Sequence, residues 1–540
     1  MKKTTLIFAA LIFAAAAGAQ PQPDLIARVH FAGADQISAD TNHLAFTNLF
    51  CSADARALES QTLDKLSRAP GVWFKSEIAA GAGDGAAQLR PLLDDLLKSE
   101  WIFEMRDATN GSPEYALAIR LNDERAQLWS KNLAAVLQSW TGIGISQDKS
   151  GIWELKKRQP PNLLQFSRSS SWVVIDCGQD KLSLREQILP VPARSPVADA
   201  NWLAADLNWP RLARIFPSLK EFDFPKIQMQ AVGRGGNLQL AGKLALAQPL
   251  RPLENWRLPA SLICQPLISF TAARGVAPWL AKQPWTRPLE IQPQPAQLFI
   301  WALARIPFQT FAAEPVPDAK AALDQLERQL PADANWRGQF ISPFNMVMTN
   351  NELSWRGLPF ITPFVQAVRE PEGDFLFGGF FTNPSKSKPL PPELLAQLSR
   401  PNLVYYHWEN TAERLNELPQ MSQLMLMLTR HRQIDVRSAA GKWLNHATPA
   451  LGAAVTEATQ TAPNELAFKR TAPSGLTAIE LLAFTDWLEG PQFPAFDLRM
   501  PPPRIRPGQP VKVLSMPPAP APTAKPLPNV DVTNEIRRQH

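Results

Sequence analysis

Two segments in which every second residue is apolar place the strongest constraint on the fold. Trp101, Phe103 and Met105 share one face of the first segment, and the residues from Tyr115 to Leu121 alternate in the same way. The loop between them contains Asn110-Gly111, a pair typical of tight turns between strands. Alternation on both sides of such a turn predicts a β-hairpin.

A helix and three short strands are predicted directly after this hairpin. Asn122 can cap the helix, apolar residues recur at helical spacing from Trp129 to Trp140, and Gly142 can end it. The strands are predicted over residues 151–156, 163–167 and 172–177. The order strand, helix, strand, strand is typical of an open antiparallel sheet with a helix packed on it.

The same order of elements recurs further along the chain. A second cycle starts with a strand over 297–304, and a third starts at Asn402 with a strand over 403–408. The predicted fold class is therefore α+β, with several antiparallel sheets backed by helices and up to three β-α-β-β cycles. The cycles share a pattern but not matching residues, so a quasi-repeat and a chance succession of elements both remain open.

Shifts in composition divide the 540 residues into six segments. Proline makes up 52 of the 540 residues, about twice the usual share, and is concentrated after residue 490. A tail of that composition cannot bury a core, so we predict that it is disordered and that its removal leaves the melting transition unchanged. The predicted segments are a signal peptide (1–19), a first α+β domain (20–190), a linker with a hairpin (191–258), a second α+β domain (259–390), a third (391–490) and the tail (491–540).

The N-terminus has the three parts of a secretory signal peptide. Lys2 and Lys3 are followed by the apolar run Leu6–Ala16 and by Ala17-Gly18-Ala19, a small-residue cleavage motif. We therefore predict export to the periplasm or the extracellular space, with Gln20 as the new N-terminus and no transmembrane segment after cleavage. A retained N-terminal anchor is the alternative.

The net charge of +6 falls to +4 when Lys2 and Lys3 are removed (6 − 2). Such mild basicity suits either contact with anionic surfaces or an ordinary soluble protein. No segment interleaves basic and aromatic residues densely, so nucleic acid is not a predicted partner.

Several local elements are also predicted. A strand is expected over 45–50, and a helix is expected from Ser52 to a stop at Pro70-Gly71. The glycine-rich segment 81–85 lacks the spacing of a phosphate-binding loop, so we interpret it as a connector. A hairpin over 226–246 is expected to turn through the glycines at 233–236.

Candidate chemical groups are few, and no catalytic residue, metal ligand or cofactor is predicted. The six histidines show no metal-binding spacing. His407 and Glu409 would share one face of a strand, where they could do acid–base chemistry or serve the structure. Asp176 ends an apolar strand, a position that suits a functional carboxylate or an ordinary one.

Three further sets of residues leave alternatives open. The motif S-x-x-K occurs at 146–149 and 385–388 without its usual companions, which favours chance. Met421, Met425 and Met427 would form an adaptable binding face or part of the core. Cys51, Cys177 and Cys264 would form one disulfide with a spare thiol, or stay as three buried reduced thiols.

Two segments resemble parts of exported bacterial proteins of unknown function. They are Asn402-Leu403-Val404-Tyr405-Tyr406-His407-Trp408-Glu409 and Gly475-Leu476-Thr477-Ala478-Ile479-Glu480-Leu481-Leu482. The resemblance implies a large α+β body behind a signal peptide, and it implies no activity.

Export and the lack of a recognisable catalytic motif lead to one functional expectation. We expect a non-catalytic binding or structural protein of the bacterial cell envelope, whose partner is an envelope polymer or protein. The alternative is an envelope hydrolase whose site is assembled from residues far apart in the sequence.

Overall fold

The computed structural model of the chain contains a single antiparallel sheet of 20 strands. The structure describes residues 25–40, 44–73, 83–107, 113–147, 152–156, 163–178, 184–188, 201–216, 219–220, 222–280, 296–303, 309–329, 345–358, 361–381, 390–416, 435–491 and 493–494. The predicted signal peptide and residues 495–540 of the predicted tail lie outside these ranges.

The strands are β1 (Leu25–Phe31), β2 (Trp101–Asp107), β3 (Pro113–Arg120), β4 (Ser146–Gln147), β5 (Trp153–Lys156), β6 (Leu163–Ser169), β7 (Trp172–Gly178), β8 (Leu203–Asn208), β9 (Lys226–Arg234), β10 (Asn237–Ala245), β11 (Leu267–Arg274), β12 (Gln297–Leu303), β13 (Thr310–Val316), β14 (Asn345–Met348), β15 (Glu352–Arg356), β16 (Phe364–Glu370), β17 (Gly373–Gly379), β18 (Leu403–Asn410), β19 (Ala453–Ala462) and β20 (Glu465–Ala472). The helices are α2 (Ala34–Ala39), α3 (Leu44–Phe50), α4 (Ala53–Trp73), α5 (Ala86–Lys98), α6 (Asp123–Thr141), α7 (Leu184–Ile188), α8 (Trp209–Ile215), α9 (Ala277–Leu280), α10 (Ala319–Gln329), α11 (Pro392–Leu398), α12 (Thr411–Asn416), α14 (Ala439–Ala447) and α15 (Ala478–Glu489).

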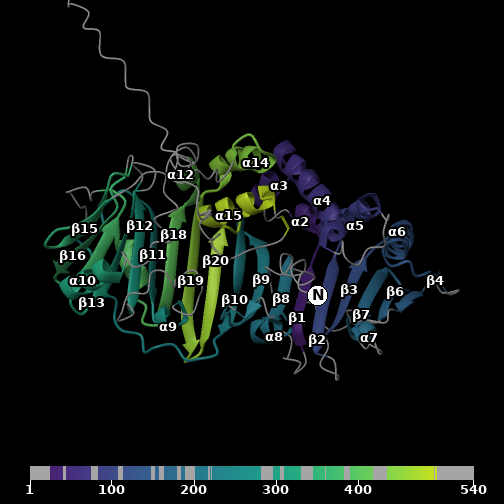
Figure 1. Cartoon of the computed structure of the whole chain (residues 1–540), viewed down its shortest axis with the longest axis horizontal. Coiled ribbons are helices and arrows are strands. Elements are labelled where there is room, and N and C mark those ends of the chain that lie inside the picture. The colour runs from purple at the N-terminus through teal and green to yellow at the C-terminus, as the bar shows by residue number, and fades with distance from the viewer. Residues whose placement is uncertain are drawn as a thin grey trace, which may run out of the picture. The chain divides into compact units, whose positions relative to one another are not determined.

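Hydrogen bonding fixes the order of the strands across the sheet. The order is β4-β5-β6-β7-β3-β2-β1-β8-β9-β10-β20-β19-β18-β11-β12-β13-β17-β16-β15-β14, and every neighbouring pair is antiparallel. Figure 1 shows the central strands of this order, from β18 to β1, side by side. The prediction of several separate sheets is therefore wrong, because alternation reveals which face of a strand is buried but not which strand pairs with it.

The strand order contains the same ten-strand arrangement twice. The first unit reads 4-5-6-7-3-2-1-8-9-10, and the second reads 14-15-16-17-13-12-11-18-19-20 from its outer edge inward, which is the same order with ten added to each number. A helix follows the third strand in both units, as α6 and α10, and another follows the seventh, as α7 and α11. The predicted threefold β-α-β-β cycle is thus wrong, and the recurring unit is longer and occurs twice.

The two units also agree in register. The pairing of β1 with β2 is shifted between Leu25 and Ala27, and the pairing of β11 with β12 is shifted between Leu267 and Ser269, which are each 242 residues further on. Such a bulge is a specific local feature that depends on the backbone around it. Gly33 and Gly275 keep the same spacing, and both have positive φ, at 93° and 73°. Topology and register together indicate an internal duplication.

The units join through their equivalent last strands, β10 and β20. Asn208 and Asn410 are the last residues of β8 and β18, and both cap the next helix by accepting from the backbone N–H three residues on. When the two units are aligned on Asn208 and Asn410, the strand pairings make Lys469 of β20 the equivalent of Ala241 of β10. These two residues pair directly with each other. An antiparallel pair in which a residue faces its own equivalent has local two-fold symmetry.

The faces of the sheet are covered in the same way in both units. In the first unit Phe103 and Ile119 pack with Trp129 of α6, and we name this side of the whole sheet the α6 face. On the opposite face Ala116, Ala118 and Val174 pack with Leu184 and Ile188 of α7. In the second unit α10 packs on the α6 face around Leu323 and Leu376, and α11 packs on the opposite face around Leu394, Phe299 and Phe377.

The predictions of helix ends and of turns were more accurate than the prediction of how many sheets the strands form. Asn122 caps α6 by accepting from the N–H of Arg125, and Gly142 ends the helix in the left-handed conformation, as predicted. The hairpin of β9 and β10 turns through Gly235 and Gly236, both with positive φ. The predicted strand over 45–50 is wrong, since α3 occupies these residues.

The predicted helix stop at Pro70-Gly71 is also wrong. Helix α4 continues through Pro70 to Trp73. Proline and glycine disfavour a helix interior by a few kcal/mol, a cost that tertiary packing can offset. The helix is held by contacts along its length, including Leu58 in the core formed with α14 and α15.

Candidate functional site

The strand β18 carries the predicted pair His407 and Glu409. Both side chains point to the α6 face, and Nε2 of His407 lies 3.4 Å from Oε2 of Glu409. The prediction that the two residues share one face of a strand is confirmed. Both are buried, with 8% of His407 and none of Glu409 exposed.

Four groups from three other parts of the chain complete this cluster. Thr271 in the neighbouring strand β11 places Oγ1 2.8 Å from Nδ1 of His407. Glu409 accepts from the hydroxyl of Thr411 at 2.8 Å, from the backbone N–H of Ala478 at 2.6 Å and from the guanidinium of Arg414 at 3.1 Å. We call these residues the Glu409 cluster.

The Glu409 cluster keeps its carboxylate ionised. Burial alone would raise the pKa of Glu409, but the hydrogen bonds from His407 and the Ala478 N–H, with the charge of Arg414, lower the pKa to about 2. A carboxyl group with so low a pKa cannot donate a proton near neutral pH. Glu409 therefore acts as a fixed negative charge.

Thr271, His407 and Glu409 place a hydroxyl, an imidazole and a carboxylate next to one another in space. A catalytic triad has the same order of groups, with a nucleophile, a base and an acid that orients the base. However, the carboxylate oxygens of Glu409 are shared with the first residues of α12 and α15 through Thr411 and Ala478. Bonds of this kind fix helix ends to the sheet. The contacts thus favour a structural role for Glu409.

The first unit provides an internal comparison for this cluster. Register makes Val29, Ala205 and Leu207 the equivalents of Thr271, His407 and Glu409. All three are apolar members of the main core of the first unit. The ten-strand arrangement thus folds without these polar groups, and the Glu409 cluster is specific to the second unit.

Asp176, the other predicted carboxylate, lies far from the Glu409 cluster. It is fully buried in β7 and points to the opposite face, where its neighbour across β3 is Ala116. Nine inter-strand steps of about 4.8 Å separate β7 from β18, or roughly 43 Å along the sheet. Asp176 and His407 therefore do not form one site.

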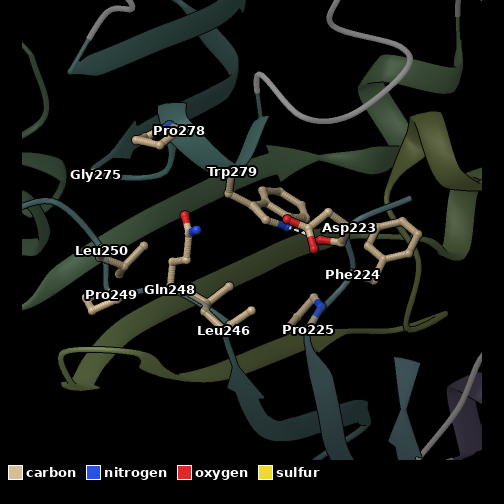
Figure 2. A pocket seen from close by; sticks show the side chains of 11 residues that line it. Asp223, Phe224, Pro225, Leu246, Gln248, Pro249, Leu250, Gly275, Pro278 and Trp279 are labelled. Atoms are coloured by element: carbon tan, nitrogen blue, oxygen red, sulfur yellow. Dashed lines mark hydrogen bonds between the residues drawn. The ribbon is translucent and has the colours of Figure 1, made fainter. Parts of the chain in front are cut away.

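A shallow pocket lies where β9 begins and β10 ends, with an open volume of about 430 Å³. Its walls are mainly apolar and include Phe224, Pro225 and Trp279, whose Nε1 donates to the backbone oxygen of Asp223 at 2.6 Å (Figure 2). Among the described residues that line it, Asp223 supplies the single carboxylate, and Ser, Cys and His are absent. The pocket therefore offers apolar contact rather than a catalytic set.

The middle of the opposite face is polar and accessible. Side chains of β8, β9, β10, β20 and β19 that point this way are half-buried or exposed, whereas those pointing to the α6 face include the buried Ala231, Ala454 and Leu466. We call the accessible set the open face: Ala204, Asp206, Gln228, Gln230, Val232, Gln239, Ala241, Lys243, Val455, Glu457, Thr459, Glu465, Ala467, Lys469 and Thr471.

The open face is centred on the junction of the two units. Ala241 and Lys469, which face each other on the local two-fold axis, both belong to it. Four of its five charged members have a side-chain partner: Lys243 lies 3.1 Å from Glu465, Arg400 lies 2.7 Å from Glu457, and Gln228 donates to Asp206 at 2.9 Å. The open face is thus a broad polar surface with its charges balanced.

The remaining sequence candidates do not add a site. Met421, Met425 and Met427 and the motif at 385–388 lie outside the described residues, as does Lys149 of the motif at 146–149. No disulfide joins Cys51, Cys177 and Cys264, and of the two alternatives the three buried reduced thiols are only partly right, because Cys51 is exposed, Cys177 is half-buried and Cys264 is buried.

Neither a membrane-spanning helix nor a cluster of metal ligands occurs in the described part of the chain. No helix there is long and apolar enough to cross a membrane. No group of three or more His, Cys, Asp or Glu side chains there could hold a metal ion.

Sequence reasoning missed Thr271, Arg414 and the open face. Thr271 belongs to β11, a strand that was not predicted, and its contact with His407 spans 136 residues. The alternation of Gln228 and Gln230 with Ile227, Met229 and Ala231 in the predicted hairpin was the available signal for the open face. No family model, characterised protein or solved structure matches the chain, so the resemblance to exported bacterial proteins stays a prediction.

Proposed function

We propose that this chain is an exported, non-catalytic binding or structural protein of the bacterial cell envelope, and that it binds through the open face. The observation that carries the proposal is the accessible polar surface formed by five strands at the junction of the units. Polar side chains on one face of an antiparallel sheet are common where that face meets water. Export rests on the signal-peptide sequence.

The experiment has two parts. Cell fractionation and N-terminal sequencing should find a mature protein that begins at Gln20 outside the cytoplasm. The mature full-length protein should then sediment with isolated envelope material, and a double substitution of Gln230→Glu and Gln239→Glu on the open face should weaken this retention about tenfold or more, since both introduce charges among balanced ones.

A matched control keeps this result interpretable. Gln138 is exposed on α6, on the other side of the sheet, so Gln138→Glu adds the same charge elsewhere. It should leave retention unchanged. Equal loss in both variants, or no retention of the unaltered protein, would refute binding through the open face.

An envelope hydrolase is the second candidate, and the contact of Thr271 with His407 favours it. Thr271→Val removes the hydroxyl and keeps the shape of the side chain. If the protein hydrolyses ester, peptide or glycoside substrates, this variant should lose at least a hundredfold of the rate while remaining folded. Activity that survives Thr271→Val would exclude this residue as the nucleophile.

A further inference from the structure

We infer that the ligand of the open face is a neutral polysaccharide of the cell envelope. This inference rests on the proposed binding function and names the chemical class of its ligand. It follows from three properties of the open face: its charge, its hydrogen-bonding groups and its lack of apolar anchors.

The charge of the open face favours a neutral ligand. Three carboxylates, of Asp206, Glu457 and Glu465, are balanced by three cationic side chains. Two of these cations form ion pairs within 3.1 Å, Lys243 with Glu465 and Arg400 with Glu457. Lys469 pairs in register with Glu457 across β19 and β20. A surface whose charges cancel over short distances has little long-range field, so it does not concentrate anionic polymers or lipid headgroups.

The hydrogen-bonding groups suit a ligand that both donates and accepts. Gln228, Gln230 and Gln239 each carry a carbonyl acceptor and two N–H donors, and Thr459 and Thr471 carry hydroxyls that do both. Gln230 of β9 lies directly across from Ala241 of β10, and Gln239 lies two residues before Ala241 in the same strand. Sugar hydroxyls likewise donate and accept, so they can satisfy such a surface over many orientations.

The side-chain sizes argue against a protein partner. Protein interfaces have an apolar centre in which Tyr, Trp, Phe or Met anchors carry most of the energy. The open face contains none of these residue types; its apolar members are alanines and the two valines Val232 and Val455. The alanines at 204, 241 and 467 have short side chains, so the space between the polar groups stays open to a ligand.

The test uses the full-length mature protein and the envelope sediment of the cells that produce it. The sediment is divided and treated with periodate, which cleaves the vicinal diols of sugars, with protease, or with detergent. Retention is measured on each portion in low salt and in 0.5 M NaCl, where the screening length is about 4 Å. The variants Gln230→Ala with Gln239→Ala and, as control, Gln138→Ala are measured in parallel.

A neutral polysaccharide predicts one pattern. Retention should fall at least tenfold after periodate, survive protease and detergent, and change less than twofold with salt; the double glutamine variant should weaken it about tenfold and Gln138→Ala should not. Retention that depends on the open face but is lost to protease, detergent or salt would overturn this inference and leave the proposed binding function standing. If none of the retention depends on the open face, this inference and the proposed binding function are both overturned.

Discussion

Glu314 is a buried carboxylic acid in the second unit. It lies in β13 on the α6 face, with 8% of its surface exposed, opposite Leu376 of β17. Burial raises the pKa of Glu314 to about 7. Its equivalent in the first unit is Ile119, a core residue, so the carboxyl group occupies a position that the fold fills with an apolar side chain.

The raised pKa predicts a pH dependence of stability. The folded protein binds the proton of Glu314 more tightly than the unfolded chain does, so this contribution is fully present below about pH 4.5 and is lost as the pH rises through about 7. The loss over this window is about 3 kcal/mol. Glu314→Gln should remove it, and urea unfolding of both proteins at pH 5 and pH 8 measures the difference. If the stability of the variant falls between pH 5 and pH 8 by as much as that of the unaltered protein, the prediction is contradicted.

The pKa of Glu409 is shifted in the opposite direction to that of Glu314, so its effect on stability has the opposite dependence on pH. Its pKa of about 2 lies below that of the unfolded chain, so its contribution is present above about pH 4.5 and is lost as the pH falls towards 2. Glu409→Gln leaves Arg414 without its carboxylate, and breaking a buried ion pair in this way costs about 3 kcal/mol. The free energy of unfolding at pH 7 tests this, with Thr271→Val as the control that keeps the ion pair.

At the scale of elements, the Glu409 cluster connects β18 to the ends of α12 and α15. Helix α15 has in addition its own capping box, in which Thr477 and Glu480 bond reciprocally. Because Glu409 accepts from the N–H of Ala478, its loss should loosen the first turn of α15 before the rest of the fold. Hydrogen exchange of α15 in Glu409→Gln should accelerate more than that of α6, which has no contact with the cluster.

The boundary of the predicted tail is a second question at this scale. Phe493 packs edge-on against Trp487 of α15, with ring centroids 4.8 Å apart, and Lys65 of α4 lies over its ring. The tail therefore begins later than the predicted residue 491. A chain ending at Pro494 should melt with the full-length protein, whereas one ending at Gly490 should melt about 1 °C lower, since a lost aromatic contact is worth about 1 kcal/mol and the entropy of unfolding of so large a body is about 1 kcal/mol/K. Equal melting of the two shortened chains would show that Phe493 contributes nothing.

Elements were predictable where a signal is local. The Asn122 cap, the Gly142 stop and the hairpin of β9 and β10 each depend on residues close in sequence. The strand pairs that build the single sheet do not: β1 pairs with β8 and β10 pairs with β20 across long stretches of chain. Alternation carries no information about the partner strand, so several sheets and one sheet have the same sequence signature. For the same reason only part of the Glu409 cluster was predictable. His407 and Glu409 lie in one strand, whereas Thr271 comes from a partner strand that the sequence does not identify.

At the scale of the molecule, the pairing of β10 with β20 is the connection between the two units. Proline at Ala241 would remove a backbone donor from the middle of the sheet and should destabilise the protein by about 3 kcal/mol or more. Val347→Pro in β14, at an edge of the sheet, is the matched control and should cost less. Chemical denaturation measures both, and equal effects would argue that the junction is no more important than an edge.

The local two-fold symmetry at Ala241 and Lys469 makes this chain the covalent counterpart of a homodimer that pairs edge strand to edge strand. In a homodimer every substitution appears twice, so a buried charge in one core is a buried charge in both. Joining the copies in one polypeptide removes that constraint. One half can keep Val29, Ala205 and Leu207 as an apolar core while the other carries Thr271, His407 and Glu409, so the fusion allows two specialised halves on a single scaffold.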